Sequence, residues 1–251
     1  MRSGRAVLGA AAIFVAAVIA PPPATAGAQD SEWTSFPGGI APGATIAQIG
    51  EDDYYACTLG VIAGDPDTHR LYALTAGHCD HSDTKGQTVL YTEANSPDVA
   101  RPLGTYIASR DTDGDTVGRG DELPLYTDAG VIEIQDRTPI SSFKIAAVYP
   151  VRGVVTDRAD LPYGTEVCKY GMRTGETCGP IQVASKYTIT AKVRAIEGDS
   201  GSALYRKNND GTVDIIGLTS SVDSGDETTE FFWIAPLLET LNLQVCGCAP
   251  N

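Results

Sequence analysis

The chain has few basic residues, few histidines and only one long apolar run. Its 251 residues include 18 Lys and Arg against 32 Asp and Glu, for a formal net charge of −14. So acidic a chain excludes the basic surface that nucleic-acid binding requires. Outside residues 6–20, no stretch is apolar for long enough to cross a bilayer. We therefore expect no nucleic-acid partner and, after export, no membrane partner.

The apolar run belongs to a segment with the layout of a secretory signal peptide. Arg2 and Arg5 precede the run, and Ala24-Thr25-Ala26 follows it as a small-residue cleavage site. The run is short for a membrane anchor, which needs about 20 residues. We expect residues 1–26 to be removed and the remainder to be secreted as an extracellular protein. Losing two Arg and no acid takes its net charge from −14 to −16.

Cysteines are few but even in number, six in all. In an exported chain the default state of such cysteines is the disulfide. A zinc site is the alternative, and His78, Cys79 and His81 do lie close together in the sequence. No paired CxxC or second ligand pair accompanies them, so we expect no metal site and no cofactor.

Residues 111–122, DTDGDTVGRGDE, are the other candidate metal site. Asp111, Asp113, Asp115 and Glu122 resemble a calcium-binding loop in their spacing. Thr116 stands where such a loop requires glycine, and no helices are expected on either side. A solvated acidic loop between strands is the better interpretation, and we expect no tight calcium site.

The rest of the chain consists of many short β-type runs separated by Gly, Asp, Pro or Ser. They read TLGVIAG, RLYALTAG, QTVLYTE, LGTYIAS, AGVIEI, KIAAVYP, TEVCKYG, IQVASKYTIT, SALYR, TVDIIGLTS and TEFFWIA. This close spacing favours an antiparallel sandwich or barrel over alternating strands and helices. Residues 235–241, APLLETL, predict one helix, because Pro stands near its start and the leucines share a face. Residues 136–143, DRTPISSF, interrupt the β pattern and are interpreted as a link between two lobes.

The stretch EGDSGSAL, residues 197–204, raises the question of what Ser200 does. Gly and Asp are common turn residues, so a polar turn between two strands is one interpretation. The other is a nucleophile, which would need a base to take the hydroxyl proton. Only three histidines are present. His69 and His81 lie in polar surroundings, whereas His78 ends the strand-like run LTAGHC.

His78 is either a half-buried histidine beside a disulfide or a general base. A base of this kind needs a buried carboxylate to fix its tautomer. Asp128 is a candidate because it opens the apolar strand of YTDAGVIEI, although a turn cap is the alternative there. The order His78, Asp128, Ser200 excludes an α/β-hydrolase, whose histidine follows its serine. The subtilisin order could use Asp65 or Asp67, but its α/β scaffold does not match the strand pattern.

The motifs TAGHC, DAGVI and GDSGSAL, in this order, resemble those of the chymotrypsin-like serine proteases. VCKYGMRTGETCG is similar to the disulfide loop of the secreted bacterial branch, the streptogrisins. IIGLTS and TTEFFWIAPLLETL are similar to the last strands and closing helix of that branch. The resemblance covers roughly residues 38–245, nearly the whole mature chain.

This resemblance implies an all-β fold of two six-stranded antiparallel β-barrels, with the active site in the cleft between them. The first barrel would span residues 38–140, after a short arm at residues 27–37. The second would span residues 141–251 and carry the C-terminal helix. The implied protein is a monomeric, secreted serine endopeptidase. The alternative is a catalytically silent peptide-binding protein on the same scaffold.

The resemblance also assigns roles to single residues. His78 would act as general base, Asp128 would orient it, and Ser200 would attack the peptide carbonyl. The backbone N–H groups of Gly198 and Ser200 would form the oxyanion hole, and the Ser220 hydroxyl would support Asp128.

The walls of the primary side-chain pocket follow from the same resemblance, and they are Ala195, Ile196, Glu197, Ser221 and Val222. A branched Val222 narrows the entrance, which implies cleavage after small or medium apolar residues such as Ala or Val. Lys192 and Arg194 lie nearby in the sequence and leave a preference for acidic residues open.

The resemblance implies two disulfides, Cys57–Cys79 and Cys168–Cys178. Cys246 and Cys248 are left over, and they either bridge each other or pair between molecules. In animal members of the family a freed amino terminus pairs with the aspartate before the serine, here Asp199. FPGGIAPGAT offers no clear processing site after Lys or Arg, so the sequence identifies no partner for Asp199.

Overall fold

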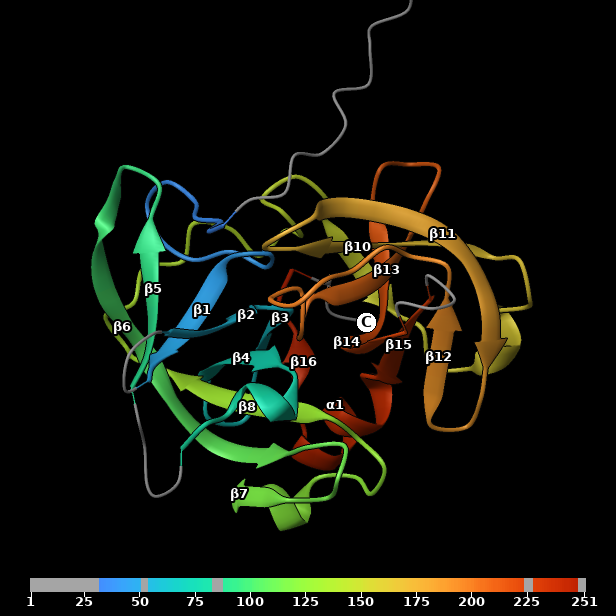
Figure 1. The fold of residues 1–251 in the computed structure, drawn as a ribbon, viewed down its shortest axis with the longest axis horizontal. Coiled ribbons are helices and arrows are strands. Elements are labelled where there is room, and N and C mark those ends of the chain that lie inside the picture. Colours follow the sequence, from blue (N-terminus) through green and yellow to red (C-terminus); the bar gives the residue numbers. More distant parts are fainter. Residues whose placement is uncertain (1–31, 51–53, 83–87, 224–227, 248–251) are drawn as a thin grey trace, which may run out of the picture.

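The computed structural model describes residues 32–50, 54–82, 88–223 and 228–247 (Figure 1). Nearly all regular structure in these ranges is β-strand, arranged in two sheets that stand side by side. The predicted signal segment, residues 1–26, lies outside them. Within the described part of the chain, no helix has the length and apolar character to span a membrane.

The first sheet contains the amino-terminal strands, blue to green in Figure 1. They are β1 (Thr45–Ile49), β2 (Tyr54–Thr58), β3 (Val61–Gly64), β4 (Leu71–Thr75), β5 (Thr88–Glu93), β6 (Ser96–Arg110), β7 (Thr116–Gly118) and β8 (Ala129–Ile134). Neighbouring strands follow the order β3-β4-β8-β6-β5-β1-β2, all antiparallel, and β7 pairs with β6. Only Leu59 and Gly60 separate β2 from β3, so the two ends of this order are joined by the chain itself.

The second sheet closes on itself as a six-stranded barrel. Its strands are β10 (Glu166–Gly171), β11 (Gly175–Ala184), β12 (Thr188–Ala191), β13 (Ala203–Lys207), β14 (Val213–Asp223) and β15 (Thr228–Trp233). They follow the order β13-β10-β11-β12-β15-β14, and pairing of β13 with β14 completes the ring. β9 (Val151–Val154) adds to β14 in parallel. The predicted double-barrel fold is therefore confirmed.

One expected strand is wrong. KIAAVYP, residues 144–150, forms a tight turn in which only Ile145 and Tyr149 pair, as an isolated bridge. Ala146 and Ala147 both have positive φ, 54° and 58°, which turns the chain back on itself. Burial of Ile145 beneath this turn accounts for the apolar pattern that imitated a strand.

The predicted helix is present as α1 (Ala235–Leu241), with Pro at its amino-terminal end and Asn242 in a left-handed cap. Leu237 and Leu238 are buried. After the helix, β16 (Gln244–Val245) pairs with β3 of the first sheet. The end of the described chain thus returns from the second sheet to the first. The boundary at residues 140 and 141 stays a prediction, with β1–β8 before it and β9–β15 after it.

The core has a part in each sheet and a part between them. Ile46, Leu59, Leu103 and Ile132 fill the first barrel, each at most 1% exposed. Val167, Ile181, Leu204 and Phe231 fill the second and are fully buried. A third cluster draws on both sheets, with Leu74 and Val131 from the first and Tyr205 and Ile215 from the second. Full burial of one such aliphatic side chain contributes roughly 1.5–3 kcal/mol, so the shared cluster strongly stabilises the packing of the two barrels against each other.

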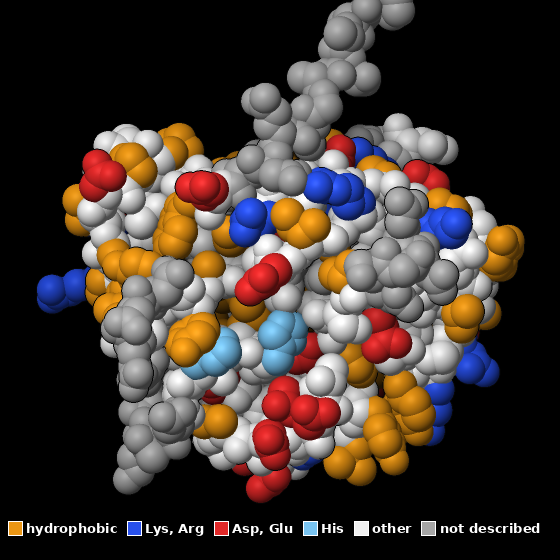
Figure 2. Space-filling view, in the orientation of Figure 1, with side chains coloured by type: hydrophobic (Ala, Val, Ile, Leu, Met, Phe, Trp, Pro, Cys, Tyr) orange, Lys and Arg blue, Asp and Glu red, His pale blue; other side chains and the backbone are white. Residues whose placement is uncertain are grey.

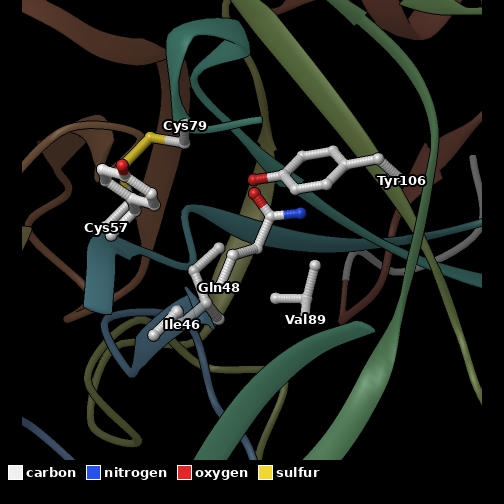
Figure 3. A pocket seen from close by; sticks show the side chains of 8 residues that line it. Ile46, Gln48, Cys57, Cys79, Val89 and Tyr106 are labelled. Carbon is white, nitrogen blue, oxygen red and sulfur yellow. A yellow bond between two sulfur atoms is a disulfide. The ribbon is translucent and has the colours of Figure 1, made fainter. Parts of the chain in front are cut away.

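Both implied disulfides are present, Cys57–Cys79 and Cys168–Cys178. Figure 3 shows the first of them inside the first barrel, with Gln48 and Tyr106 pointing toward one another beside it. The Gln48 amide holds the segment that follows Cys79. Its Nε2 donates to Ser82 Oγ at 3.0 Å, and its Oε1 accepts from His81 N at 2.8 Å. Cys248 lies outside the described residues, so the pairing of Cys246 and Cys248 stays a prediction.

The acidic loop at residues 111–115 connects β6 to β7, and its first carboxylate is bonded within the loop. Asp111 Oδ1 accepts a hydrogen bond from Asp115 N at 2.8 Å. The short 3-10 helix η2 (Gly120–Glu122) follows β7. The expectation that this loop holds no tight calcium site stays a prediction.

Candidate active site

His78 lies in the single-turn 3-10 helix η1 (Gly77–Cys79), which follows β4. Its Nδ1 is 2.8 Å from Asp128 Oδ2, and its side chain is 36% exposed while that of Asp128 is fully buried. The other two histidines, His69 and His81, are exposed, as predicted. Asp128 therefore fixes one ring nitrogen of His78 and leaves the other side of the ring facing solvent.

The Asp128 carboxylate, directly before β8, accepts four hydrogen bonds. Oδ1 accepts from the backbone N–H groups of Gly77 at 2.7 Å and His78 at 2.9 Å. Oδ2 accepts from the Ser220 hydroxyl at 2.5 Å and faces His78 Nδ1. Glycine at position 77 lets this backbone pack closely against the end of β6, because a Cβ there would lie 1.9 Å from the carbonyl oxygen of Arg110. A buried carboxylate is costly unless its oxygens are satisfied, and here both are.

Ser220 comes from β14, so the second barrel contributes one of these four bonds. Asp128 and His78 come from the first barrel. The carboxylate thus joins the two barrels at the point where the candidate base stands. A turn cap would not require a donor from the other barrel, so that alternative for Asp128 is disfavoured.

The protonation equilibria of the two residues are coupled. Burial lowers the pKa of His78, but the hydrogen bond and the negative charge of Asp128, with a further contribution from Asp111, hold it above its ordinary value. Burial raises the pKa of Asp128, but bonding and charge from His78 and the Ser220 bond outweigh it and keep the pKa below its ordinary value. Both shifts favour an imidazolium facing a carboxylate.

Ser200 is half-buried in the loop between β12 and β13. Its carbonyl oxygen accepts from Thr58 N at 2.8 Å, which fastens the loop to the end of β2. Gly201 has φ +81°, and a Cβ there would lie 2.0 Å from Thr75 Oγ1, so the loop lies tight against the first barrel. In the described part of the chain, Ser200 Oγ makes no hydrogen bond to His78. Such contacts are often long in free enzymes and shorten when substrate binds.

The backbone around Gly198 is shaped by neighbours on both sides. Gly198 has φ +94°, and its carbonyl oxygen accepts from Thr58 Oγ1 at 2.8 Å. The same hydroxyl accepts from Met172 N at 2.9 Å. Among the described residues, the N–H groups of Gly198 and Ser200 donate no hydrogen bond. Two unengaged donors beside the candidate nucleophile are what an oxyanion hole requires.

Asp199, which the sequence left without a partner, has five. Its Oδ1 accepts from Arg173 N at 2.9 Å and Thr174 N at 3.1 Å, and its Oδ2 accepts from Thr174 Oγ1 at 2.7 Å and Ile196 N at 3.1 Å. Lys169 Nζ lies 3.2 Å from Oδ2, and both side chains are fully buried. Lys169 also bonds the Thr174 hydroxyl.

The cation that sequence reasoning missed lies inside a motif already quoted, VCKYGMRTGETCG. Lys169 directly follows Cys168, and in a strand the two side chains point to opposite faces. A lysine in an apolar strand between two predicted disulfide cysteines was the available signal.

No family model matches the chain. Uncharacterized protein Rv1815 of Mycobacterium tuberculosis is 31% identical over 192 residues, which cover 74% of this chain and 75% of the relative. The chymotrypsin of Cellulomonas bogoriensis has a TM-score of 0.56 at 21% identity, covering 83% of this chain and 98% of that one. A glutamic acid-specific serine protease, described as using a histidine triad in substrate binding, has a TM-score of 0.59 at 15% identity, covering 82% and 100%.

The chain belongs to the family of Rv1815, and its fold is that of the chymotrypsin-like serine proteases. This fold brings His78, Asp128 and Ser220 together and sets Gly198 and Ser200 in one loop beside them.

The predicted pocket residues of this chymotrypsin-like chain divide between two cavities. Ala195, Ile196 and Val222 line a cavity of about 620 Å³, together with Thr177, Cys178, Lys192, Val193 and Arg194. Glu197 instead borders a second cavity of about 540 Å³, which also touches Gly198. Ser221 is exposed in β14, beside Val222.

The raised pKa of His78 predicts the pH at which the imidazole becomes a base. Because Asp128 stabilises the cation, we expect the ring to lose its proton at a pH above 6.5, the ordinary value for histidine. Activity carried by the neutral ring would then fall as the pH drops through that value. Proton NMR titration of the Ser200→Ala protein can follow His78 directly, since only three imidazoles are present.

Asp128→Asn is the matched variant for this titration. It removes the negative charge, so the midpoint for His78 should fall, and hydrolysis should drop by a factor on the order of 10⁴ because the tautomer is wrong. An unchanged midpoint in Asp128→Asn would show that the carboxylate does not set the basicity of His78.

The buried pair of Lys169 and Asp199 yields a prediction on stability. Lys169→Met leaves a buried carboxylate without its cation, which should lower the free energy of unfolding by about 3–5 kcal/mol. Adding Asp199→Asn in the same chain should recover part of that loss, because the uncompensated charge is removed. Urea unfolding monitored by circular dichroism measures both variants. A Lys169→Met protein as stable as the parent would contradict the role of the pair.

Proposed function

We propose that the protein is a secreted serine endopeptidase that cleaves peptide bonds through an acyl-enzyme. The observation that carries the proposal is the Asp128 carboxylate, which bonds His78 from the first barrel and Ser220 from the second. A structural histidine has no need of a fully buried, four-fold hydrogen-bonded carboxylate at its Nδ1. A general base does, because the carboxylate fixes the tautomer and stabilises the cation that forms.

In the proposed reaction, Ser200 Oγ attacks the carbonyl carbon of the peptide bond while His78 Nε2 takes the hydroxyl proton. The carbonyl oxygen becomes negative and is held by the N–H groups of Gly198 and Ser200. His78 then gives its proton to the leaving amine as the C–N bond breaks, which leaves the acyl group on Ser200. Water repeats the sequence with His78 as base, releasing the acid and restoring the serine.

The unengaged N–H groups support the oxyanion assignment. Removing one such donor raises the barrier by about 3 kcal/mol in related chemistry, so the shape of the loop is as consequential as the nucleophile. The Asp199 carboxylate supplies that shape, since it bonds the backbone of Ile196, Arg173 and Thr174 around the loop.

We further propose that the protein acts outside the cell, as a monomer without a cofactor, on peptide or protein substrates. Two disulfides and the apolar segment at residues 6–20 support export. The cavity of about 620 Å³ beside Ala195 and Val222 would take the side chain of the residue before the scissile bond.

Labelling with a fluorophosphonate tests the nucleophile directly. We expect the purified protein to be labelled once, and Ser200→Ala and His78→Ala to be folded but unlabelled and inactive on ester and amide substrates. Circular dichroism and a thermal melt establish that each variant is folded. Absence of labelling on the folded parent would favour the silent peptide-binding alternative. Labelling of Ser200→Ala would overturn the assignment of the nucleophile.

Peptides that differ only in the residue before the scissile bond test the primary pocket. We expect a higher kcat/KM for Ala or Val than for Lys or Phe, because Val222 borders the cavity. The preference should be graded, since one methylene in such a pocket contributes only about 1–3 kcal/mol. Val222→Gly should widen acceptance toward larger residues.

A Glu peptide that surpasses both Ala and Val would instead assign the pocket to an acidic residue, held by Lys192 and Arg194. This arrangement would differ from a histidine triad, because no histidine is among the described residues that line this cavity.

A further inference from the structure

The second cavity, of about 540 Å³, lies against Glu197 and Gly198. Trp33, Tyr54, Met172 and Arg173 contribute to its lining. The two cavities meet the chain at successive residues, with Ile196 bordering the larger one and Glu197 and Gly198 the smaller. A substrate that crosses Ser200 and places its acyl side in the larger cavity would extend its leaving-group side toward the smaller one.

Arg173 lines this cavity and is held in place by the loop that carries Gly198. Its backbone N–H donates to Asp199 Oδ1 at 2.9 Å. Its aliphatic stem lies over Gly198, because a Cβ added there would be 2.8 Å from Arg173 Cγ and 3.4 Å from Cδ. Arg173 therefore stands next to the candidate oxyanion hole, fixed by the same carboxylate that shapes it.

Among the described residues, the guanidinium of Arg173 has no hydrogen-bond or ion-pair partner. Its Nε is buried and has no hydrogen-bond partner, and the group makes no ion pair with any residue in the described ranges. A buried donor without a partner is unfavourable, and a guanidinium offers five donors in a planar fork. That fork matches a carboxylate, which can accept two of its hydrogen bonds at once.

Two aromatic side chains also line this cavity. The rings of Trp33 and Tyr54 meet edge to face with centroids 6.3 Å apart. Trp33 Nε1 donates to Thr92 Oγ1 at 2.7 Å, which ties the ring to β5. Thr34 Oγ1 donates to the carbonyl oxygen of Met172 at 2.8 Å, which fastens this part of the amino-terminal arm beside Arg173. Two hydrogen bonds and one ring contact thus hold this side of the cavity in place.

We propose that this cavity is a subsite for a carboxylate on the leaving-group side of the substrate, bound by Arg173 with its apolar portion against Trp33 and Tyr54. The proposal rests on the endopeptidase function proposed above and names part of its substrate class. The carboxylate belongs either to an Asp or Glu side chain just after the scissile bond or to the free carboxyl terminus of a short leaving peptide. Arg173 acts by positioning and takes no part in bond making.

Two acidic residues, Glu32 and Glu197, border the same cavity and favour the opposite charge. Neither forms an ion pair with Arg173 in the described structure, so neither satisfies its donors. Figure 2 shows several Lys and Arg side chains above the two histidines on this face, with Asp and Glu side chains both below and above them. Among the described residues that line the cavity, Arg173 is the one cation that can bind a substrate carboxylate.

Quenched-fluorescence peptides with a common acyl side test the subsite. The first or second residue after the scissile bond is Glu, Gln or Lys, and each peptide is made with a free and an amidated carboxyl terminus. We expect the carboxylate peptides to have a kcat/KM about 10–100-fold above their neutral counterparts, in the range of a hydrogen-bonded charge, mainly through a lower KM. A gain that follows the side chain, or the free terminus, identifies the source of the carboxylate.

Variants connect this gain to the residue. Arg173→Gln should abolish the preference, measured as the ratio of kcat/KM for the Glu peptide to that for the Gln peptide within the variant, and Arg173→Lys should retain part of it. Arg137→Gln, which removes an exposed cation in the loop after β8, serves as the matched control and should change nothing. Equal rates for Glu and Gln peptides in the parent, a preference for Lys, or a preference that survives in Arg173→Gln would overturn the proposal.

Binding to the Ser200→Ala protein separates failure of the subsite from failure of the enzyme. The chain has two tryptophans, Trp33 at the cavity and Trp233, which is 7% exposed in the second barrel. The Glu peptide should change the tryptophan emission, and Trp33→Phe or Arg173→Gln should remove that change. Such binding without any hydrolysis by the parent would retain the subsite and overturn the proposed function. Hydrolysis with no dependence on Arg173 would do the reverse, and neither binding nor hydrolysis would overturn both.

Discussion

The geometry of the candidate site depends on one buried charge, the Asp199 carboxylate. Its oxygens bond three backbone N–H groups and one hydroxyl, and Lys169 supplies the compensating cation. These contacts fold the chain on either side of Gly198, so the N–H groups of Gly198 and Ser200 stay unengaged. A charge of either sign left alone in this interior would cost several kcal/mol, which makes the pair an all-or-none support for the loop. In the animal enzymes that the motifs resemble, a freed amino terminus is expected to pair with this aspartate, whereas here the cation is a side chain of β10.

The second constraint is the joint between the barrels. Asp128 is bonded from both, Thr58 of β2 bonds the carbonyl oxygen of Gly198, and the shared apolar cluster packs the barrels against each other. The candidate base and the candidate nucleophile come from different barrels, so their separation is set by this joint. The contact at Gly201 shows how closely the two barrels are packed, since a Cβ added there would lie 2.0 Å from Thr75 Oγ1. A small shift of one barrel would therefore change the distance that proton transfer depends on.

Residues with short-range or chemically explicit signals were predictable from the sequence. Most of the longer strands, the helix at residues 235–241 and both disulfides followed from pattern and resemblance, whereas β1, β2 and β9 were not among the expected runs. The pairing of Lys169 with Asp199 was not predictable in this way, because the strand context marks the lysine as unusual but only the tertiary fold brings Asp199 to it. The strand predicted at residues 144–150 was wrong for a related reason. Ile145 is buried by a turn, and an apolar run of that length does not distinguish a turn from a strand. The cavity between Trp33 and Arg173 joins segments about 140 residues apart, a juxtaposition that no local pattern encodes.

Arg173 links these features, since its two ends serve different functions. Its backbone N–H helps to satisfy Asp199, while its side chain extends over Gly198 into the cavity beside Trp33. Replacing the side chain keeps the backbone bond and so leaves the oxyanion loop intact, whereas disturbing Asp199 would affect the loop and the cavity together. A substrate group bound to Arg173 would conversely hold the stem of that residue down on Gly198. Binding on the leaving-group side and order in the candidate oxyanion loop would then support each other. Both would act through Arg173, whose backbone N–H bonds the Asp199 carboxylate.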